Sequence, residues 1–120
     1  MILVLLFQPV ISHVMDQILV EERVQYKGFY EIGWESSAFY RKTSDNFILS
    51  PMWLNLDSLY MNDSLRNILN VDGFMKVEGI KRTGGDFGHL GAAASELVVK
   101  RLIIIDTTFT LEQFFYKEVE

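Results

Sequence analysis

The sequence predicts a mostly β protein, a small OB-like five-stranded barrel with one short helix between the third and fourth strands. Apolar and polar residues alternate along several segments, as expected for strands with one buried face. One segment ahead of the C-terminal tail has helical spacing, and it follows the third extended segment. A helix at this point among five strands is the layout of an OB-type barrel. The chain has 120 residues, 49% of them hydrophobic, which suits one domain with a real core.

Residues 20–40 carry the clearest alternation. The apolar residues on one parity are Val20, Val24, Tyr26, Tyr30, Ile32 and Trp34. Glu22 and Phe29 interrupt this pattern, and a regular strand of this length would be unusual. Gly28 and Gly33 permit a bulge or a turn, because glycine has no Cβ. The segment therefore forms either two strands or one long bent strand.

The third strand is predicted from residues 47–56, which follow a polar turn at residues 41–46. Pro51 has no N–H to give to a neighbouring strand. We therefore expect part of this strand to lie at an edge or in a bulge.

The helix is predicted within residues 57–70, where apolar residues recur at helical spacing. Asp57 or Ser58 can cap its start. The polar residues 62–64 offer hydrogen bonds that compete with a helix. A shorter helix that begins at Asp63 is the alternative.

The C-terminal half predicts two more strands, at residues 74–82 and 95–106, the second dense in β-branched residues. Residues 83–94 are rich in glycine and are predicted to be a loop or a strongly bent connection. The tail, residues 107–120, is a short strand, a helix or a frayed end.

Composition limits the function. The net charge is −5, and there is no basic stripe of the kind that neutralises phosphates, which argues against nucleic acid. The pairs Lys81-Arg82 and Lys100-Arg101 are interpreted as solvated strand edges. The absence of cysteine excludes disulfides, thiolate nucleophiles and Cys-ligated metals.

Candidate chemistry centres on a few side chains. His13 and His89 are the two histidines, and neither has the partners that a zinc site needs. Residues 84–91 resemble a phosphate-binding loop, but they contain no lysine and lead into a strand, so turn geometry explains them better. An anion-binding nest of backbone N–H groups is the option left. Glu35 with Ser37 is not a catalytic pair, since no base lies nearby in the sequence.

Three blocks of sequence carry a resemblance. They are Gly28-Phe29-Tyr30-Glu31-Ile32-Gly33-Trp34-Glu35-Ser36-Ser37-Ala38-Phe39, Val77-Glu78-Gly79, and Gly88-His89-Leu90-Gly91 followed by Glu96-Leu97-Val98-Val99. In this order they resemble a group of small, uncharacterised bacterial proteins, often exported, with a β-barrel-like core. The resemblance implies one β domain and an export signal, and it assigns no activity or ligand residue. This chain departs from it in having no basic start and an extended tail after Ile105.

The domain organisation follows from the apolar opening. Residues 1–14 carry no charge and are too short to span a bilayer, which needs about 20 apolar residues. Residues 1–15 are therefore either a signal-peptide remnant or a buried first strand, and residues 16–120 are a single β-barrel-like domain. The resemblance favours export, hence a periplasmic or extracellular location, with the cytoplasm as the alternative.

The leading functional hypothesis is a non-enzymatic, exported binding or accessory domain that acts through its barrel surface and the loop of residues 84–91, with no cofactor, metal or transmembrane helix. Its ligand would be a small molecule or a protein. The alternative is an OB-type module that binds single-stranded nucleic acid through its aromatic residues. A hydrolase that uses Glu35 and His89 is a weaker alternative. The residues chosen for a ligand site are Trp34, Glu35, Ser37 and His89.

Overall fold

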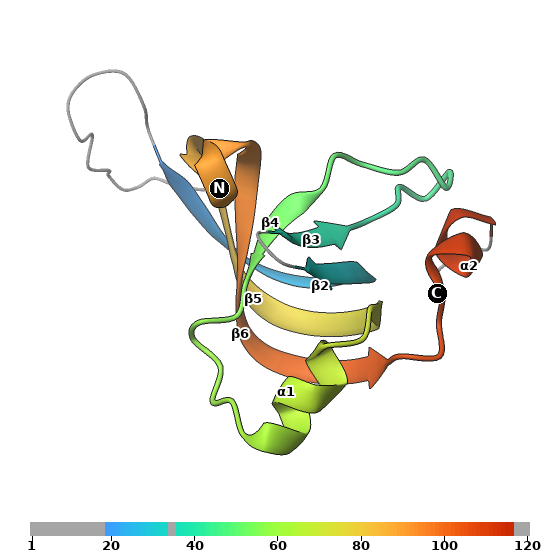
Figure 1. Cartoon of the computed structure of the whole chain (residues 1–120). Helices are drawn as coiled ribbons and strands as arrows, with labels where there is room; N and C mark the ends of the chain where they lie inside the picture. The colour runs from blue at the N-terminus through green and yellow to red at the C-terminus, as the bar shows by residue number, and fades with distance from the viewer. Residues whose placement is uncertain (1–18, 34–35, 117–120) are drawn as a thin grey trace.

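The computed structural model describes residues 19–33 and 36–116 (Figure 1). Its strands are β2 (Val20–Gly33), β3 (Ser36–Tyr40), β4 (Met52–Asn55), β5 (Gly73–Phe87) and β6 (Ala93–Asp106). They close a barrel in the order β2-β3-β4-β6-β5, in which β4 and β6 pair in parallel and all other neighbours are antiparallel. Helix α1 (Asp63–Leu69) lies between the third and fourth strands. The predicted mostly β fold, a small five-stranded barrel with one short helix at this position, is confirmed.

Residues 20–40 form two strands, one of the two arrangements that the alternation allowed. β2 and β3 make an antiparallel hairpin in which Phe29 lies opposite Tyr40 and Gly33 opposite Ser36. Gly28 allows a close approach of the backbones, because a Cβ there would lie 2.1 Å from the carbonyl oxygen of Tyr40. The predicted first strand or signal at residues 1–15 lies outside the described residues.

The third strand is shorter than predicted. Only Met52–Asn55 pairs with neighbouring strands, and residues 47–51 belong to the connection from β3, joined by an isolated bridge between Lys42 and Ile48. The hydroxyl oxygen of Thr43 accepts hydrogen bonds from the backbone N–H groups of Asp45 and Phe47. These local bonds, together with the missing N–H of Pro51, explain why residues 47–51 do not continue the strand.

The helix takes the shorter of the two predicted forms. The Asn62 side chain accepts a hydrogen bond of 2.8 Å from the Leu65 N–H, which makes Asn62 the N-cap. The prediction of Asp57 or Ser58 as the cap is therefore wrong. The reason is that residues 57–61 form a turn and an irregular segment ahead of the helix.

The predicted loop or strongly bent connection at residues 83–94 is confined to residues 88–92. β5 continues to Phe87 and β6 begins at Ala93, so only residues 88–92 connect them, in part as the 3₁₀ helix η1 (His89–Gly91). The glycines are accommodated within the strand because the pairing is irregular between Thr83 and Phe87. The tail takes one of its predicted forms, the short helix α2 (Leu111–Tyr116).

The barrel core consists of side chains directed inward from every strand, together with one residue of α1. Its buried members are Tyr30, Phe39, Met52, Leu54, Leu69, Met75, Val77, Leu97 and Val99. Burying one such side chain contributes about 1.5–3 kcal/mol to the free energy of folding. Outside the barrel, Phe114 of α2 packs against Phe29 with ring centroids 5.9 Å apart. The core thus holds the barrel closed, and α2 covers part of its outer face.

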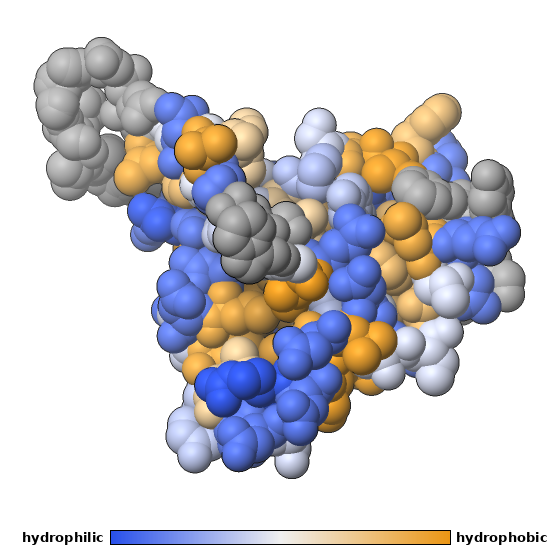
Figure 2. Space-filling model, viewed as in Figure 1, coloured by the Kyte–Doolittle hydropathy of each residue, from blue (hydrophilic) through white to orange (hydrophobic). Residues whose placement is uncertain are grey.

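Some apolar residues reach the surface. Figure 2 shows them interspersed with hydrophilic residues on the face viewed in Figure 1. The most exposed are Leu90 at 89%, Tyr60 at 85% and Phe47 at 71%. Among the helices of the described residues, none has the length and hydropathy needed to cross a membrane.

Candidate functional site

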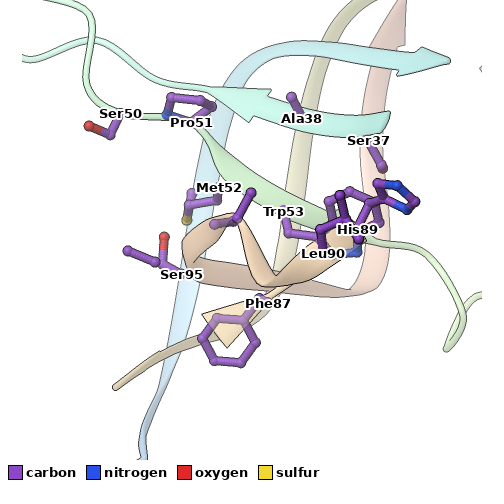
Figure 3. Close-up of a pocket in the computed structure, with 13 residues that line it drawn as sticks. Ser37, Ala38, Ser50, Pro51, Met52, Trp53, Phe87, His89, Leu90 and Ser95 are labelled. Carbon is purple, nitrogen blue, oxygen red and sulfur yellow. The ribbon is translucent and has the colours of Figure 1, made fainter. Parts of the chain in front are cut away.

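A pocket of about 600 Å³ lies where β3 and β4 face the connection between β5 and β6 (Figure 3). Its lining residues are Ser37, Ala38, Ser50, Pro51, Met52, Trp53, Phe87, His89, Leu90, Ala92, Ala93, Ala94 and Ser95. Most are apolar, a few carry a hydroxyl or an imidazole, and none is an aspartate, glutamate, lysine or arginine. The pocket therefore presents an uncharged, mainly apolar wall with a few polar atoms.

Trp53 forms the aromatic wall because of the alternation of β4. Met52 and Leu54 are buried in the barrel core, so Trp53 between them faces outward. It lies opposite Ala38 on β3, whose small side chain leaves room beside the indole. The large ring on one strand and the small residue on the next together give the pocket its depth.

Gly88 packs directly against the indole of Trp53. Its φ angle is 78°, in the region that favours glycine. A Cβ at this position would lie 2.3 Å from Cε3 of Trp53 and 2.5 Å from Cδ2. No other residue fits without moving the ring, so the glycine allows the β5–β6 connection to pack directly on Trp53.

Leu90 stands at the rim of the pocket in an unusual conformation. Its φ of 59° and ψ of 17° lie in the left-handed region, which is uncommon for residues other than glycine. The side chain is also 89% exposed. A strained backbone that displays a large apolar side chain beside an apolar pocket is typical of a binding surface.

A buried carboxylate, that of Glu96, lies beside Trp53 on the adjacent strand β6. Glu96, opposite Trp53 in the parallel pairing, is 7% exposed. Its Oε1 lies 2.8 Å from Nη1 of Arg82, and its Oε2 accepts a hydrogen bond of 3.0 Å from Asn55. Both oxygens thus have partners within the protein, so Glu96 joins β4, β5 and β6 instead of offering a charge to a ligand.

Arg82 also corrects an interpretation of the sequence. The pair Lys81-Arg82 was expected at a solvated strand edge, but β5 has a strand on both sides. The Arg82 side chain is 31% exposed, and its Nε lies 3.0 Å from Glu21 on β2. Closure of the barrel turns this position from an edge into a junction of β2, β5 and β6.

The structure brings together two of the four residues predicted for a ligand site. Ser37 and His89 both line the pocket. The Ser37 hydroxyl donates a hydrogen bond of 2.7 Å to the backbone carbonyl of Leu54, which is a structural role. Trp34 and Glu35 lie outside the described residues, so the hydrolase hypothesis based on Glu35 stays a prediction.

Sequence reasoning did not choose Trp53, Phe87, Gly88 or Leu90 individually as site residues, although it expected the loop of residues 84–91 to take part in binding. Trp53 could have been identified from its position between two apolar residues of a strand, because the alternation of the strand then directs its side chain away from the core. Gly88 lies within the Gly-His-Leu-Gly block, but nothing in its spacing indicated that it packs on Trp53. Within residues 19–33 and 36–116, no group of three His, Cys, Asp or Glu side chains could hold a metal ion.

Comparisons with known proteins returned no match: no protein-family model, curated protein or solved structure matches this chain. The functional argument therefore uses the geometry and chemistry of the pocket.

Proposed function

We propose that this protein is a non-enzymatic binding domain that accepts an uncharged, mainly apolar group in the pocket beside Trp53. The observation that carries the proposal is a pocket of about 600 Å³ with an aromatic wall and no charged lining residue. Ligand sites are commonly concave and mainly apolar, with a few polar groups that set orientation. The hydroxyls of Ser50 and Ser95 and the imidazole of His89 are candidates for that role.

The position of the pocket on the barrel supports the same proposal. We infer an OB-type barrel from the five strands, the helix between the third and fourth, and the parallel pairing of the third with the fifth. Barrels of this type bind ligands at the face of the second and third strands and at the loops beside it. Those elements correspond here to β3, β4 and residues 88–92. This is an analogy of fold, and the pocket chemistry carries the choice of ligand.

The test is a titration of the full chain with 2-naphthalenemethanol, an uncharged apolar probe, followed by nuclear magnetic resonance. We expect saturable shifts of the Trp53 indole N–H and of the amides at residues 88–95. Trp53→Ala should abolish the saturation, because it removes the aromatic wall. Tyr60→Ala is the matched control, since Tyr60 is 85% exposed and does not line the pocket. Shifts that grow without saturation, or that arise elsewhere, would contradict the proposal.

The alternative is a module for single-stranded nucleic acid, favoured by Trp53 as an aromatic surface on which a base could stack. The pocket lining has no lysine or arginine to neutralise phosphates, which makes this the second choice. Titration with oligothymidylate at several salt concentrations distinguishes the two. Binding that weakens steeply with salt supports the alternative, and absence of binding removes it.

We also propose that the protein is exported, on the evidence of the uncharged opening of residues 1–14. Expression of the full gene product in a bacterial host, followed by cell fractionation and N-terminal sequencing, tests this. Cleavage near Asp16 with the protein outside the cytoplasm supports export. An intact chain in the cytoplasm contradicts it and strengthens the nucleic-acid alternative.

A further inference from the structure

The first residues of β6 have a strand partner on one edge only. Ala93 lies opposite Phe87 and Ser95 opposite Thr83, both on β5. Pairing with β4 on the other edge begins one residue later, at Glu96 opposite Trp53. Among the described residues, β4 reaches only to Met52, which this parallel register places beside Ser95, so no strand runs along the β4 side of residues 93 and 94. An unpaired strand edge offers N–H and C=O groups to an incoming backbone.

The chain ahead of β4 does not fill this space. Pro51 immediately precedes β4 and has no N–H, so the ladder between β4 and β6 cannot extend in this direction in a regular way. Pro51 and Ser50 line one side of the pocket, and residues 92–95 line the other. The pocket therefore lies between the backbones of β4 and β6, which separate on the N-terminal side of their first paired residues, Trp53 and Glu96.

The side chains along this edge are small and neutral: Ala92, Ala93, Ala94 and Ser95. They allow a second backbone to approach closely. Apolar side chains of an added strand would meet Trp53 or Leu90, because successive side chains of a strand alternate between its faces. Within the part of the chain that the structure describes, the edge thus combines backbone groups that lack a strand partner with a receptor for side chains, the two requirements for recognition by strand addition.

A second edge of the barrel has the opposite character. β3 pairs only with residues 29–33 of β2, so residues 20–27 have β5 on one side and no described strand on the other. This segment carries Glu21, Glu22, Arg23 and Lys27. Charged side chains are a common means of blocking unwanted pairing at a strand edge. Residues 99–106 of β6 also have no described strand on the β4 side, and they carry Lys100, Arg101 and Asp106. Unlike these charged stretches, residues 93–95 carry no charged side chain.

We propose that the ligand is an extended, uncharged segment of polypeptide that pairs with β6 at residues 93 and 94 and inserts an apolar side chain beside Trp53. This rests on the proposed function, because it uses the same pocket. It adds the chemical class of the ligand and the backbone that receives it.

The experiment compares two peptides on the full chain. The first is acetyl-Thr-Val-Thr-Leu-Thr-Val-Thr-amide, and the second is the same peptide with alternate backbone nitrogens methylated, which removes donors and keeps the side chains. We expect the first peptide to bind. The methylated peptide should bind at least about tenfold more weakly when its methylated nitrogens are those that face β6, since each lost hydrogen bond weakens binding by up to about tenfold. Hydrogen exchange should show new protection among the amides of residues 93–95.

Variants test the location. Ala94→Lys and Ala94→Glu place a charge of either sign on the exposed Ala94, and both should weaken peptide binding by about tenfold or more. Val20→Lys is the matched control at the other edge, where Val20 is 52% exposed, and it should leave binding unchanged.

The outcomes separate this proposal from the function on which it rests. Equal binding of both peptides, or saturation by 2-naphthalenemethanol without any peptide binding, overturns the strand-addition proposal and retains the apolar pocket. Failure of every probe overturns both. The peptide proposal is also overturned if the chain binds no peptide but self-associates, and if this self-association persists in Ala94→Lys.

Discussion

The barrel interior and the pocket beside Trp53 are both apolar, but one is filled and the other is hollow. In the interior, strands paired on both sides direct large side chains such as Tyr30, Phe39 and Met75 into one space, where they are fully buried. At the pocket, β4 and β6 separate before their first paired residues, Trp53 and Glu96. More than half of the residues that line the pocket are alanine or serine. Continuous pairing with large residues produces a core, whereas interrupted pairing with small residues produces a site.

The strongest test of this contrast is Phe39→Ala in the interior. Phe39 is fully buried, so we expect a loss of about 3–5 kcal/mol in the free energy of unfolding, because the cavity removes many contacts. Urea denaturation measures it. Phe47→Ala, at a side chain that is 71% exposed, should change stability by no more than about 0.5 kcal/mol. Similar losses for both variants would show that the interior is not tightly packed.

Gly88→Ala should affect ligand binding more than the stability of the fold. The new Cβ displaces the Trp53 ring, so we expect probe binding to weaken by about tenfold or more, with a stability loss of about 1–3 kcal/mol from the strained backbone. Gly91→Ala is the matched control. Its φ of 67° is also positive, but its Cβ would approach Asp86 at 3.2 Å and not Trp53. Equal loss of binding in the two variants would argue that strain, not the indole position, controls the site.

Leu90→Asn should separate stability from binding. Asparagine adopts the left-handed region more readily than leucine, so we expect stability to rise by up to about 1 kcal/mol. Peptide binding should weaken at the same time, because the exposed apolar side chain at the rim is lost. Thermal unfolding and the peptide titration measure the two effects. Unchanged affinity would exclude Leu90 from the binding surface.

The smallest effect is expected away from both regions, at Glu78. The hydrogen bond from Arg101 holds the pKa of the Glu78 carboxyl below its ordinary value. A carboxylate whose pKa is lower in the folded state stabilises the fold above the unfolded-state pKa, and this is lost as the pH falls through the folded-state pKa. Glu78→Gln should therefore lower Tm slightly at neutral pH, and the difference should vanish in acid. A difference that persists at low pH would assign another role to Glu78.

Glu78 and Glu96 each form an ion pair with an arginine, but the two pairs differ in burial. Glu78 and Arg101 meet on the surface, where solvent screens the attraction. Glu96 is buried beside Trp53 and is held by Arg82 and Asn55. In the sequence, both were ordinary acidic residues near a basic pair, and only the pairing of β4, β5 and β6 distinguishes them.

Much of the fold was predictable because strand periodicity is a local property. The alternation of Met75 and Val77 identified β5, and the β-branched residues after Ser95 identified most of β6. The error at residues 83–94 has a local cause as well: glycine usually marks a loop, yet here neighbouring strands stabilise an irregular continuation of β5. Propensity cannot anticipate a partner strand that lies far away in the sequence.

The site was predictable only in part. Ser37 and His89 were chosen and do line the pocket, but Trp53, Phe87 and Leu90 were not chosen, and Trp34 and Glu35 lie outside the described residues. By itself, the sequence determined a β domain with a helix after its third strand and an absence of thiol chemistry, because these follow from residue type and local spacing. The tertiary structure alone decided that Gly88 packs on Trp53 and that β4 and β6 part to leave a pocket. Both depend on contacts between residues distant along the chain, which no local pattern records.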